Sequence, residues 1–284
     1  RKRKGVTANA EYRPNEQATY FLRGNYSDFI DDAVRQRSGI GFAQRGVVSL
    51  DDTSAIVDVG NVAARGKTKI VQDVRLRKEQ LSIWGVSAGG ENQFGNYTVD
   101  YQAGYSYADE DNRRRLAIEY VFKGLTQVDY SDGKSINPRI RFTGQGGDAT
   151  DAGKYVFNGF NNTPELVEED HWEFMANARR DFDTDNPAFV KVGLRGRLTD
   201  KSADLETFKS TANPAAVQTL DANTIGPGPN PFATGMPLID PRIKHAIDAQ
   251  LPAFAVVRDP VGSTAGDWRS SEDVLGAYVM GGYT

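Results

Sequence analysis

The side chains that most often carry enzymatic chemistry are sparse in this sequence. It has no cysteine and only two histidines, His171 and His245, which stand far apart. Neither lies in an HExxH spacing, which would place two zinc ligands on one face of a helix. The stretch TGQGGDATDAGK has glycines but lacks the GK[ST] ending of a phosphate-binding loop. We therefore predict no enzymatic activity, no metal site and no cofactor.

A charged run, ADEDNRRR at residues 108–115, is a second place to look for chemistry. Clustered carboxylates bind calcium in some loops, but the spacing here does not follow the EF-hand pattern. Arginines beside acidic residues are also typical of a solvated loop tip. We expect residues 108–115 to form such a tip.

Solute binding would use a different set of side chains, namely polar groups that orient the solute and aromatic surfaces that contact a sugar. Four arginines lie on the polar face of predicted strands, where they could contact a ligand or another domain, and these are Arg23, Arg179, Arg195 and Arg197. The alternative is that they are ordinary charges paired with neighbours such as Glu173 and Asp181. Further candidates lie in or beside the long segment 202–269, and these are Phe232, His245 and Trp268. There the alternative is that loop residues simply pack on each other.

The elements that position these side chains are predicted from an alternation with a period of two. In the first segment every second residue is apolar or aromatic, namely Val6, Ala8, Ala10 and Tyr12. After a turn at residues 14–16 the same alternation resumes with Ala18, Tyr20, Leu22, Gly24 and Tyr26. The clearest alternation is that of Tyr97, Val99, Tyr101, Ala103, Tyr105 and Tyr107. This period indicates β-strands, because successive side chains point to opposite faces. A tyrosine stripe is typical of an interface between apolar and wet media.

The remaining runs give an uneven layout. We predict strands at 69–91, 116–122, 126–130, 171–182 and 190–198, and a last strand from Glu272 onward. The strand at 69–91 has a bulge near Lys78-Glu79, because its alternation shifts there. A hairpin at Lys123-Gly124 joins the strand at 116–122 to the one at 126–130. The turns at 14–16, 92–96 and 184–187 are tight, whereas the connections 28–67, 131–170 and 202–269 are long. Long structureless loops are uncommon in compact soluble domains, but outer-membrane barrels have short turns on one side and long loops on the other. We predict an all-β chain, 1–284, that forms a partial antiparallel transmembrane β-barrel with long extracellular loops.

Composition excludes several classes of protein. With 34 basic and 38 acidic side chains the net charge is −4, which argues against a general nucleic-acid binder. Nowhere do about 18 consecutive apolar residues occur, so a helical membrane protein is excluded. The basic start, RKRKGVTANAEYR, lacks the apolar run of a signal peptide, and the last run, EDVLGAYVMGGYT, has a strand pattern. We expect the chain to be a fragment of a longer one.

Several segments resemble, in the same order, the barrel of TonB-dependent receptors from Caulobacter-, Sphingomonas- and Xanthomonas-like bacteria. RKGVTANAEYRPNEQATYFLRGNYSDFIDD is similar to an early barrel hairpin of that family, and GNYTVDYQAGYSYADEDNRR to the next hairpin. DYSDGKSINPRIRFTG resembles a loop of the family, and FVKVGLRGRLTDK and SSEDVLGAYVMGGYT resemble two later strands. No single one of these motifs is specific to the family, but their occurrence in this order is.

The resemblance implies an outer-membrane barrel of about 22 strands whose lumen is closed by a plug domain. It also implies uptake of a scarce solute, such as a siderophore or an oligosaccharide, energised through the TonB-ExbB-ExbD system. The expected partners are outer-membrane lipid, that system and a small-molecule or oligosaccharide ligand. Two alternatives stay open: a soluble or cell-surface β-rich carbohydrate-binding module, and an outer-membrane enzyme that has a Ser/His pair facing the same way.

Overall fold

The computed structural model describes residues 1–42, 46–59, 68–136, 138–143, 149–183, 187–210, 217–227 and 235–283. Most of these residues lie in antiparallel strands, and the helices are short. No helix in the described part of the chain is both long and apolar enough to cross a membrane. The predicted all-β class is therefore confirmed.

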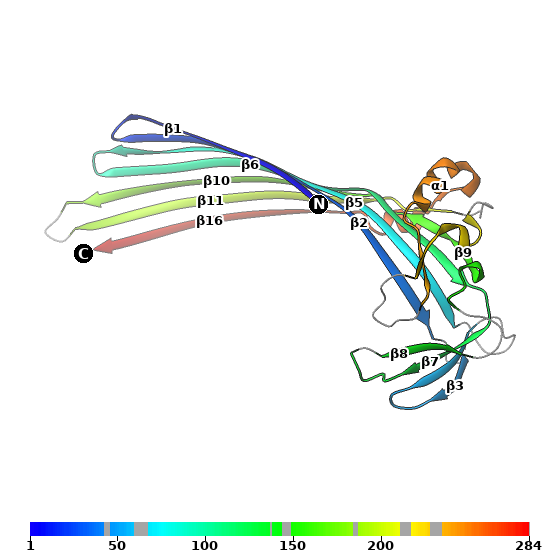
Figure 1. Ribbon diagram of the computed structural model, residues 1–284. Helices are drawn as coiled ribbons and strands as arrows, with labels where there is room; N and C mark the ends of the chain where they lie inside the picture. Colours follow the sequence, from blue (N-terminus) through cyan, green and yellow to red (C-terminus); the bar gives the residue numbers. More distant parts are fainter. Residues whose placement is uncertain are drawn as a thin grey trace.

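The main feature is a ten-stranded sheet, seven of whose strands pair in one continuous order. These seven strands form a long curved surface (Figure 1). In spatial order they are β1 (Lys2–Asn15), β2 (Ala18–Gly41), β5 (Lys69–Phe94), β6 (Tyr97–Phe122), β10 (Glu165–Phe182), β11 (Ala188–Leu205) and β16 (Trp268–Tyr283). Each strand runs antiparallel to its neighbours. Within the described residues β1 and β16 are the two edges, and the sheet does not close into a barrel.

The connections between these strands differ at the two ends of the sheet. Tight hairpins join β1 to β2, β5 to β6 and β10 to β11 at one end, which we call the hairpin end. Long connections link β2 to β5, β6 to β10 and β11 to β16 at the other end, the loop end (Figure 1). The predicted separation of tight turns from long connections is confirmed, although residues 184–186 of the third turn lie outside the described residues.

The loop end carries smaller elements. A four-stranded sheet contains β3 (Val47–Leu50), β4 (Ala55–Val59), β7 (Thr126–Ser131) and β8 (Arg139–Thr143). The remaining strands are β9 (Tyr155–Asn162), which pairs with β6, β12 (Phe208–Lys209), β15 (Val257–Arg258), and the pair β13 (Thr224–Pro227) and β14 (Pro237–Ile239). The α-helices are α1 (Ile243–Ala249) and α2 (Pro260–Thr264), and 3-10 turns span Ala152–Lys154, Asp221–Asn223 and Leu251–Phe254.

The hydrophobic core lies at the loop end. Ile118 and Tyr120 of β6 are fully buried together with Phe157 of β9, Ile247 of α1 and Phe254. The Tyr120 and Phe157 rings meet edge to face with centroids 5.5 Å apart, an arrangement that aromatic pairs prefer. The Tyr120 hydroxyl donates to a backbone carbonyl at 2.8 Å, so its burial leaves no polar group unsatisfied.

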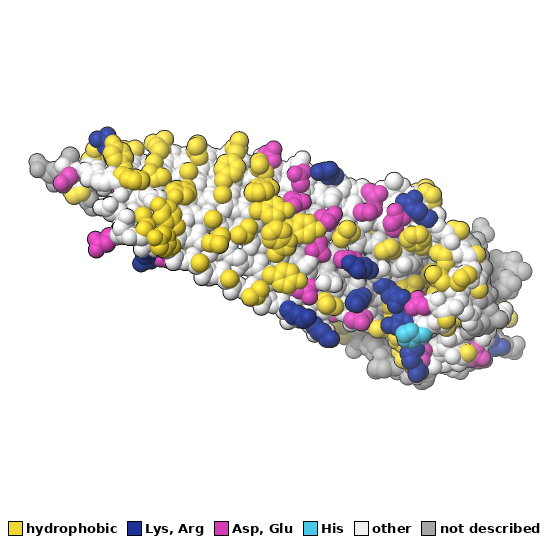
Figure 2. Space-filling view, turned by 90° about the horizontal axis from the view of Figure 1, so that it is seen from above, with side chains coloured by type: hydrophobic (Ala, Val, Ile, Leu, Met, Phe, Trp, Pro, Cys, Tyr) yellow, Lys and Arg dark blue, Asp and Glu magenta, His cyan; other side chains and the backbone are white. Residues whose placement is uncertain are grey.

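The hairpin half of the sheet has no such core, because its apolar side chains are exposed. Cross-strand pairing places Val6 with Tyr26, Tyr26 with Trp84 and Trp84 with Tyr107, so the apolar parities of neighbouring strands share one face. On this apolar face Leu194 is 62% exposed and Val279 is 78% exposed. Figure 2 shows hydrophobic side chains over the hairpin half of the face and charged side chains nearer to the loops.

A β-bulge separates the two halves of the central hairpin. Lys78 pairs with Arg114 and Gln80 with Asp111, so Asn112 and Arg113 of β6 together oppose one residue of β5. The predicted bulge is at the expected level, but its extra residue is on β6, since the register of β5 against β2 is regular. One extra residue changes which alternate side chains of β6 point to each face. Between the hairpin end and the bulge, the odd-numbered residues of β6 lie on the apolar face. Between the bulge and the loop end, the even-numbered residues lie on that face.

Four expectations about individual elements are wrong. Residues 108–115 are not a loop tip but lie inside β6, which continues beyond the hairpin half to Phe122. β2 continues to Gly41 rather than ending near residue 28, because its second half pairs along the whole of β5. β7 pairs with β4 and β8 rather than with β6, and the last strand begins at Trp268 instead of Glu272.

Candidate functional site

The polar face of the hairpin half contains a groove of about 380 Å³. Its floor is made of small residues of β5 and β6, since Gly85 lies opposite Ser106 and Ser87 opposite Gly104. Arg23 and Asn25 line it on the β2 side, and His171 and Glu173 line it on the β10 side. Small side chains in the two central strands leave the hollow open, while the flanking strands supply polar groups that can orient a solute.

Most charged groups around this groove are paired. Arg195 donates to Glu173 at 3.2 Å, and Arg197 lies 3.5 Å from Glu272. Lys191 lies 3.5 Å from Asp100. These pairs are partly solvent-exposed, and each contributes little to stability because water screens it. The polar face around the groove therefore carries charges of both signs, most of them paired.

The predicted site residues fall at separate places on the sheet. Arg23 lines the groove, and its guanidinium lies 4.2 Å above the Phe21 ring centroid. Arg195 and Arg197 share the polar face with it and are ion-paired, as the alternative interpretation expected. Arg179 lies at the hairpin end, where it pairs with Asp181 at 2.6 Å, so it is remote from the groove.

The predicted aromatic and histidine candidates do not join the groove. Trp268 is the first residue of β16 at the loop end of the sheet, and it pairs with Ala203. His245 is an exposed residue of α1. Phe232 lies outside the described residues. His171 does line the groove, and its Nδ1 lies 3.0 Å from the Thr199 hydroxyl, as expected of a satisfied side chain.

A serine within the groove fits a catalytic sequence pattern that our sequence reasoning missed. Residues 85–89 read GVSAG, which matches the GxSxG pattern with Ser87 at its centre. That pattern presents a nucleophile only where a strand turns sharply into a helix, whereas Ser87 lies in the interior of β5. The structure records no hydrogen bond between Ser87 and His171 in its described part. The arrangement therefore lacks both the elbow and the nucleophile–base contact.

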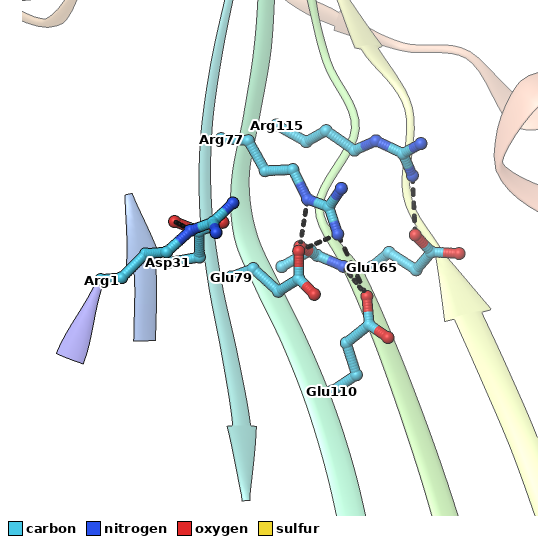
Figure 3. A network of polar contacts seen from close by, with 8 residues as sticks. Arg1, Asp31, Arg77, Glu79, Glu110, Arg115 and Glu165 are labelled. Carbon is cyan, nitrogen blue, oxygen red and sulfur yellow. Dashed lines mark hydrogen bonds and ion pairs between the residues drawn. The ribbon is translucent and has the colours of Figure 1, made fainter. Parts of the chain in front are cut away.

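A second hollow, which we call the arginine hollow, lies on the same face nearer to the loops. Its volume is about 540 Å³, and Arg35, Arg75, Arg77 and Arg115 line it. Figure 3 shows two of these side chains with the carboxylates that contact them. The Arg77 guanidinium contacts Glu79 and lies 3.5 Å from Glu110, and Arg115 lies 2.7 Å from Glu165.

Sequence reasoning missed the arginine hollow because it assigned two of these residues to other surroundings. Arg35 was placed in a connection, Arg115 in a loop tip, and the bulge hid which residues of β6 face β5. One signal was present: Arg35 and Arg37, like Arg75 and Arg77, are spaced two apart and so share a face of a strand.

Charged groups in the loops have structural partners. The Arg258 guanidinium donates to Glu206 and lowers the pKa of that carboxyl. Lys209 and the backbone N–H of Gly262 lower the pKa of Asp259, which caps α2. Arg242 lowers the pKa of Asp240 in the same way. Among the residues that the structure describes, no group of three metal-ligating side chains comes together.

Comparison of the sequence with protein-family models, with curated proteins and with solved structures finds no match.

Proposed function

We propose that the hairpin half of this sheet spans a bacterial outer membrane, as part of the β-barrel of a TonB-dependent receptor that takes up a scarce solute. The observation that carries the proposal is the spacing of two aromatic rows on the exposed apolar face. The row near the hairpin end, which we call the lower girdle, consists of Tyr12, Tyr20, Phe94, Tyr97 and Tyr283. The row nearer to the loops, which we call the upper girdle, consists of Tyr26, Trp84, Tyr105, Tyr107 and Trp172.

Four rings of the upper girdle, those of Trp84, Tyr105, Tyr107 and Trp172, form a connected row. The Trp84 and Tyr105 centroids lie 5.2 Å apart, and those of Tyr105 and Trp172 lie 4.7 Å apart. Aromatic side chains with one apolar and one polar end collect where hydrocarbon meets water, at both surfaces of a membrane.

The distance between the girdles fits a bilayer. Trp84 and Phe94 are ten residues apart in β5, as are Tyr97 and Tyr107 in β6. Ten residues of strand rise about 33 Å, and a tilt of about 40° leaves about 25 Å across the membrane. The outward apolar band of an outer-membrane barrel is about 25 Å tall. Aliphatic residues such as Leu22, Val86 and Val192 fill the space between the girdles.

Charged side chains begin just beyond the upper girdle on the same face. The Tyr107 hydroxyl donates to Glu168 at 2.5 Å, and the Tyr105 hydroxyl donates to Asp170. These tyrosines thus have an apolar ring on one side and a charged partner on the other. That arrangement suits the level at which lipid chains give way to headgroups.

The polar face then serves as the wall of the lumen, and its groove and arginine hollow are open to a solute. The expected partners are outer-membrane lipid on the apolar face, the solute on the polar face, and the TonB-ExbB-ExbD system for energy. No cofactor and no catalytic step are part of the proposal.

The proposal is tested by labelling Leu194 and Arg195, neighbours in β11 that are similarly exposed but lie on opposite faces. Because these 284 residues include no cysteine, Leu194→Cys and Arg195→Cys each introduce the only thiol of this chain for a fluorescent probe, once any cysteine elsewhere in the intact protein is replaced by Ser. In the intact protein reconstituted in liposomes, we expect a lipid-attached quencher to act on the probe at 194 and a water-soluble quencher to act on the probe at 195.

Equal quenching of both probes by the water-soluble reagent would overturn the proposal. It would favour the soluble or cell-surface carbohydrate-binding module, whose two sheet faces both meet water or protein.

A further inference from the structure

The arginine hollow has an unusually one-sided charge. Its lining contains four guanidinium groups and no carboxylate, and the other lining residues are uncharged, namely Ala33, Leu76, Leu116, Ala117, Asn161, Thr163 and Leu205. The Asn161 side-chain amide adds a neutral donor beside the arginines. A hollow with this lining favours a negatively charged occupant.

The register sets the arginines against each other. Arg35 of β2 lies directly opposite Arg75 of β5, and Arg77 of β5 lies directly opposite Arg115 of β6. Like charges directly opposite each other in a sheet are destabilising. A pair of this kind without carboxylate partners costs stability, and a bound anion would offset that cost.

The two pairs differ in how they are neutralised. Arg77 has Glu79 and Glu110 as partners, and Arg115 has Glu165. Figure 3 shows these carboxylates gathered on one side of the two guanidiniums. The neighbouring Arg37 is neutralised by Asp73. Arg35 and Arg75, by contrast, make no ion pair and no side-chain hydrogen bond with any residue that the structure describes.

We propose that Arg35 and Arg75 bind a small solute that carries at least two carboxylate or phosphate groups. A guanidinium presents a planar fork that matches both groups with two parallel hydrogen bonds. Side chains directly opposite each other start about 5 Å apart at Cβ, so two forks can grip one oxyanion or two adjacent ones. The inference rests on the proposed function, because it names the substrate class of that transporter.

Equilibrium binding to the detergent-solubilised intact protein tests the assignment without requiring uptake. The probes are tricarballylate, pyrophosphate and, as a singly charged control, butyrate. We expect saturable binding of at least one multiply charged probe, with affinity that falls as salt rises, and no measurable binding of butyrate at the same concentration. The stronger of the two multiply charged probes identifies the preferred group.

The variants separate these two arginines from general surface charge. Arg35→Gln with Arg75→Gln should weaken binding by about 30-fold or more, which corresponds to the loss of charge-assisted hydrogen bonds. Arg139→Gln with Arg269→Gln removes the same charge from exposed side chains elsewhere and should change affinity less than about twofold. Arg35→Lys with Arg75→Lys keeps the charge but not the fork, and should bind with intermediate affinity.

Equal binding by the Gln variant and the unaltered protein, or no binding of either multiply charged probe, would overturn the assignment. The quenching experiment at Leu194 and Arg195 reads the lipid-facing surface independently. Failure of the anion site therefore leaves the membrane proposal standing, and failure of the membrane proposal leaves a measured anion site without a transport role.

Discussion

Tyr101 and Gln102 are adjacent in β6, yet their side chains belong to opposite surfaces of the sheet. Tyr101 pairs with Gly90 and Ala176 on the apolar face, and Gln102 pairs with Gly89 and Met175 on the polar face. Between the girdle positions Tyr97 and Tyr107, both residues are close to the middle of the apolar band. The two positions share a strand and a level on it, so they differ mainly in the face of the sheet to which they belong.

The first prediction follows from this relationship. Tyr101→Arg should lower the free energy of unfolding in lipid by about 2–4 kcal/mol, because a charge at the bilayer midplane lacks solvation. Gln102→Arg should have a much smaller effect, since its side chain meets the wet polar face. Denaturant titration of the reconstituted protein measures both. Similar losses at the two positions would contradict the facing of the strands.

A second prediction concerns close packing between strands at Gly89. A Cβ there would meet the backbone carbonyl of Tyr101 and would lie 2.6 Å from the Phe21 ring. Gly89→Ala should therefore cost about 1–3 kcal/mol of unfolding free energy through overpacking. Gly24→Ala is the matched control, because the nearest atom to its Cβ would be 3.8 Å away. If the midpoint denaturant concentration fell equally for both variants, the close contact at Gly89 would be wrong.

A third prediction tests the bulge in β6. The Arg113 side chain is 86% exposed, so Arg113→Ala should leave the fold intact. Deletion of Arg113 removes the extra residue and would turn Ile118 and Tyr120 away from the core. We expect hydrogen exchange in residues 116–122 to become much faster in the deletion variant alone. Unchanged protection in the deletion variant would show that the bulge does not set the register.

The hairpin half was largely predictable from the sequence, because the alternation of apolar and polar residues is regular over most of it. In β6 the residues from Tyr97 to Tyr107 alternate without a bulge. In the first hairpin the register of β1 against β2 shifts between Tyr12 and Asn15, and the turn lies at Glu16–Gln17 rather than at the predicted 14–16. Local signals alone therefore give the strands, their hairpins and their two faces.

The loop half was not predictable for two physical reasons. The bulge in β6 interrupts the alternation of apolar and polar residues, so the sequence does not indicate that the strand continues through residues 108–115. The core there joins residues far apart in the chain, such as Phe157 and Phe254, whose ring centroids lie 5.7 Å apart. The arginine hollow has the same origin, since Arg35 and Arg75 meet only through the register of β2 against β5 across a long connection.

A fourth prediction concerns pH at the turn between β3 and β4. The Ser54 hydroxyl and the backbone N–H of Thr53 donate to the Asp51 carboxylate and lower its pKa from 3.8 to about 2. Because the pKa is lower in the folded state, the stabilisation is complete above the ordinary pKa and is lost as the pH falls toward 2. The carboxyl carbon shift of Asp51 should titrate with a midpoint near 2.

Asp51→Asn is the control for this titration, because its amide does not ionise, and the signal should then be absent. A midpoint near 3.8 in the unaltered protein would mean that the turn does not stabilise the charged carboxylate.

The measurement that tests the central claim most directly is the membrane depth of single tryptophans. The chain has three tryptophans, Trp84, Trp172 and Trp268, which Phe can replace. With any tryptophan outside these residues also replaced by Phe, one variant of the intact protein keeps only Trp84, in the upper girdle. Another keeps none of the three but carries Leu22→Trp, between the girdles. In bilayers of brominated lipids, we predict strongest quenching of Trp84 by bromines near the headgroups and strongest quenching at position 22 by bromines near the chain ends. Equal, depth-independent quenching at both positions, or none at either, would contradict the account.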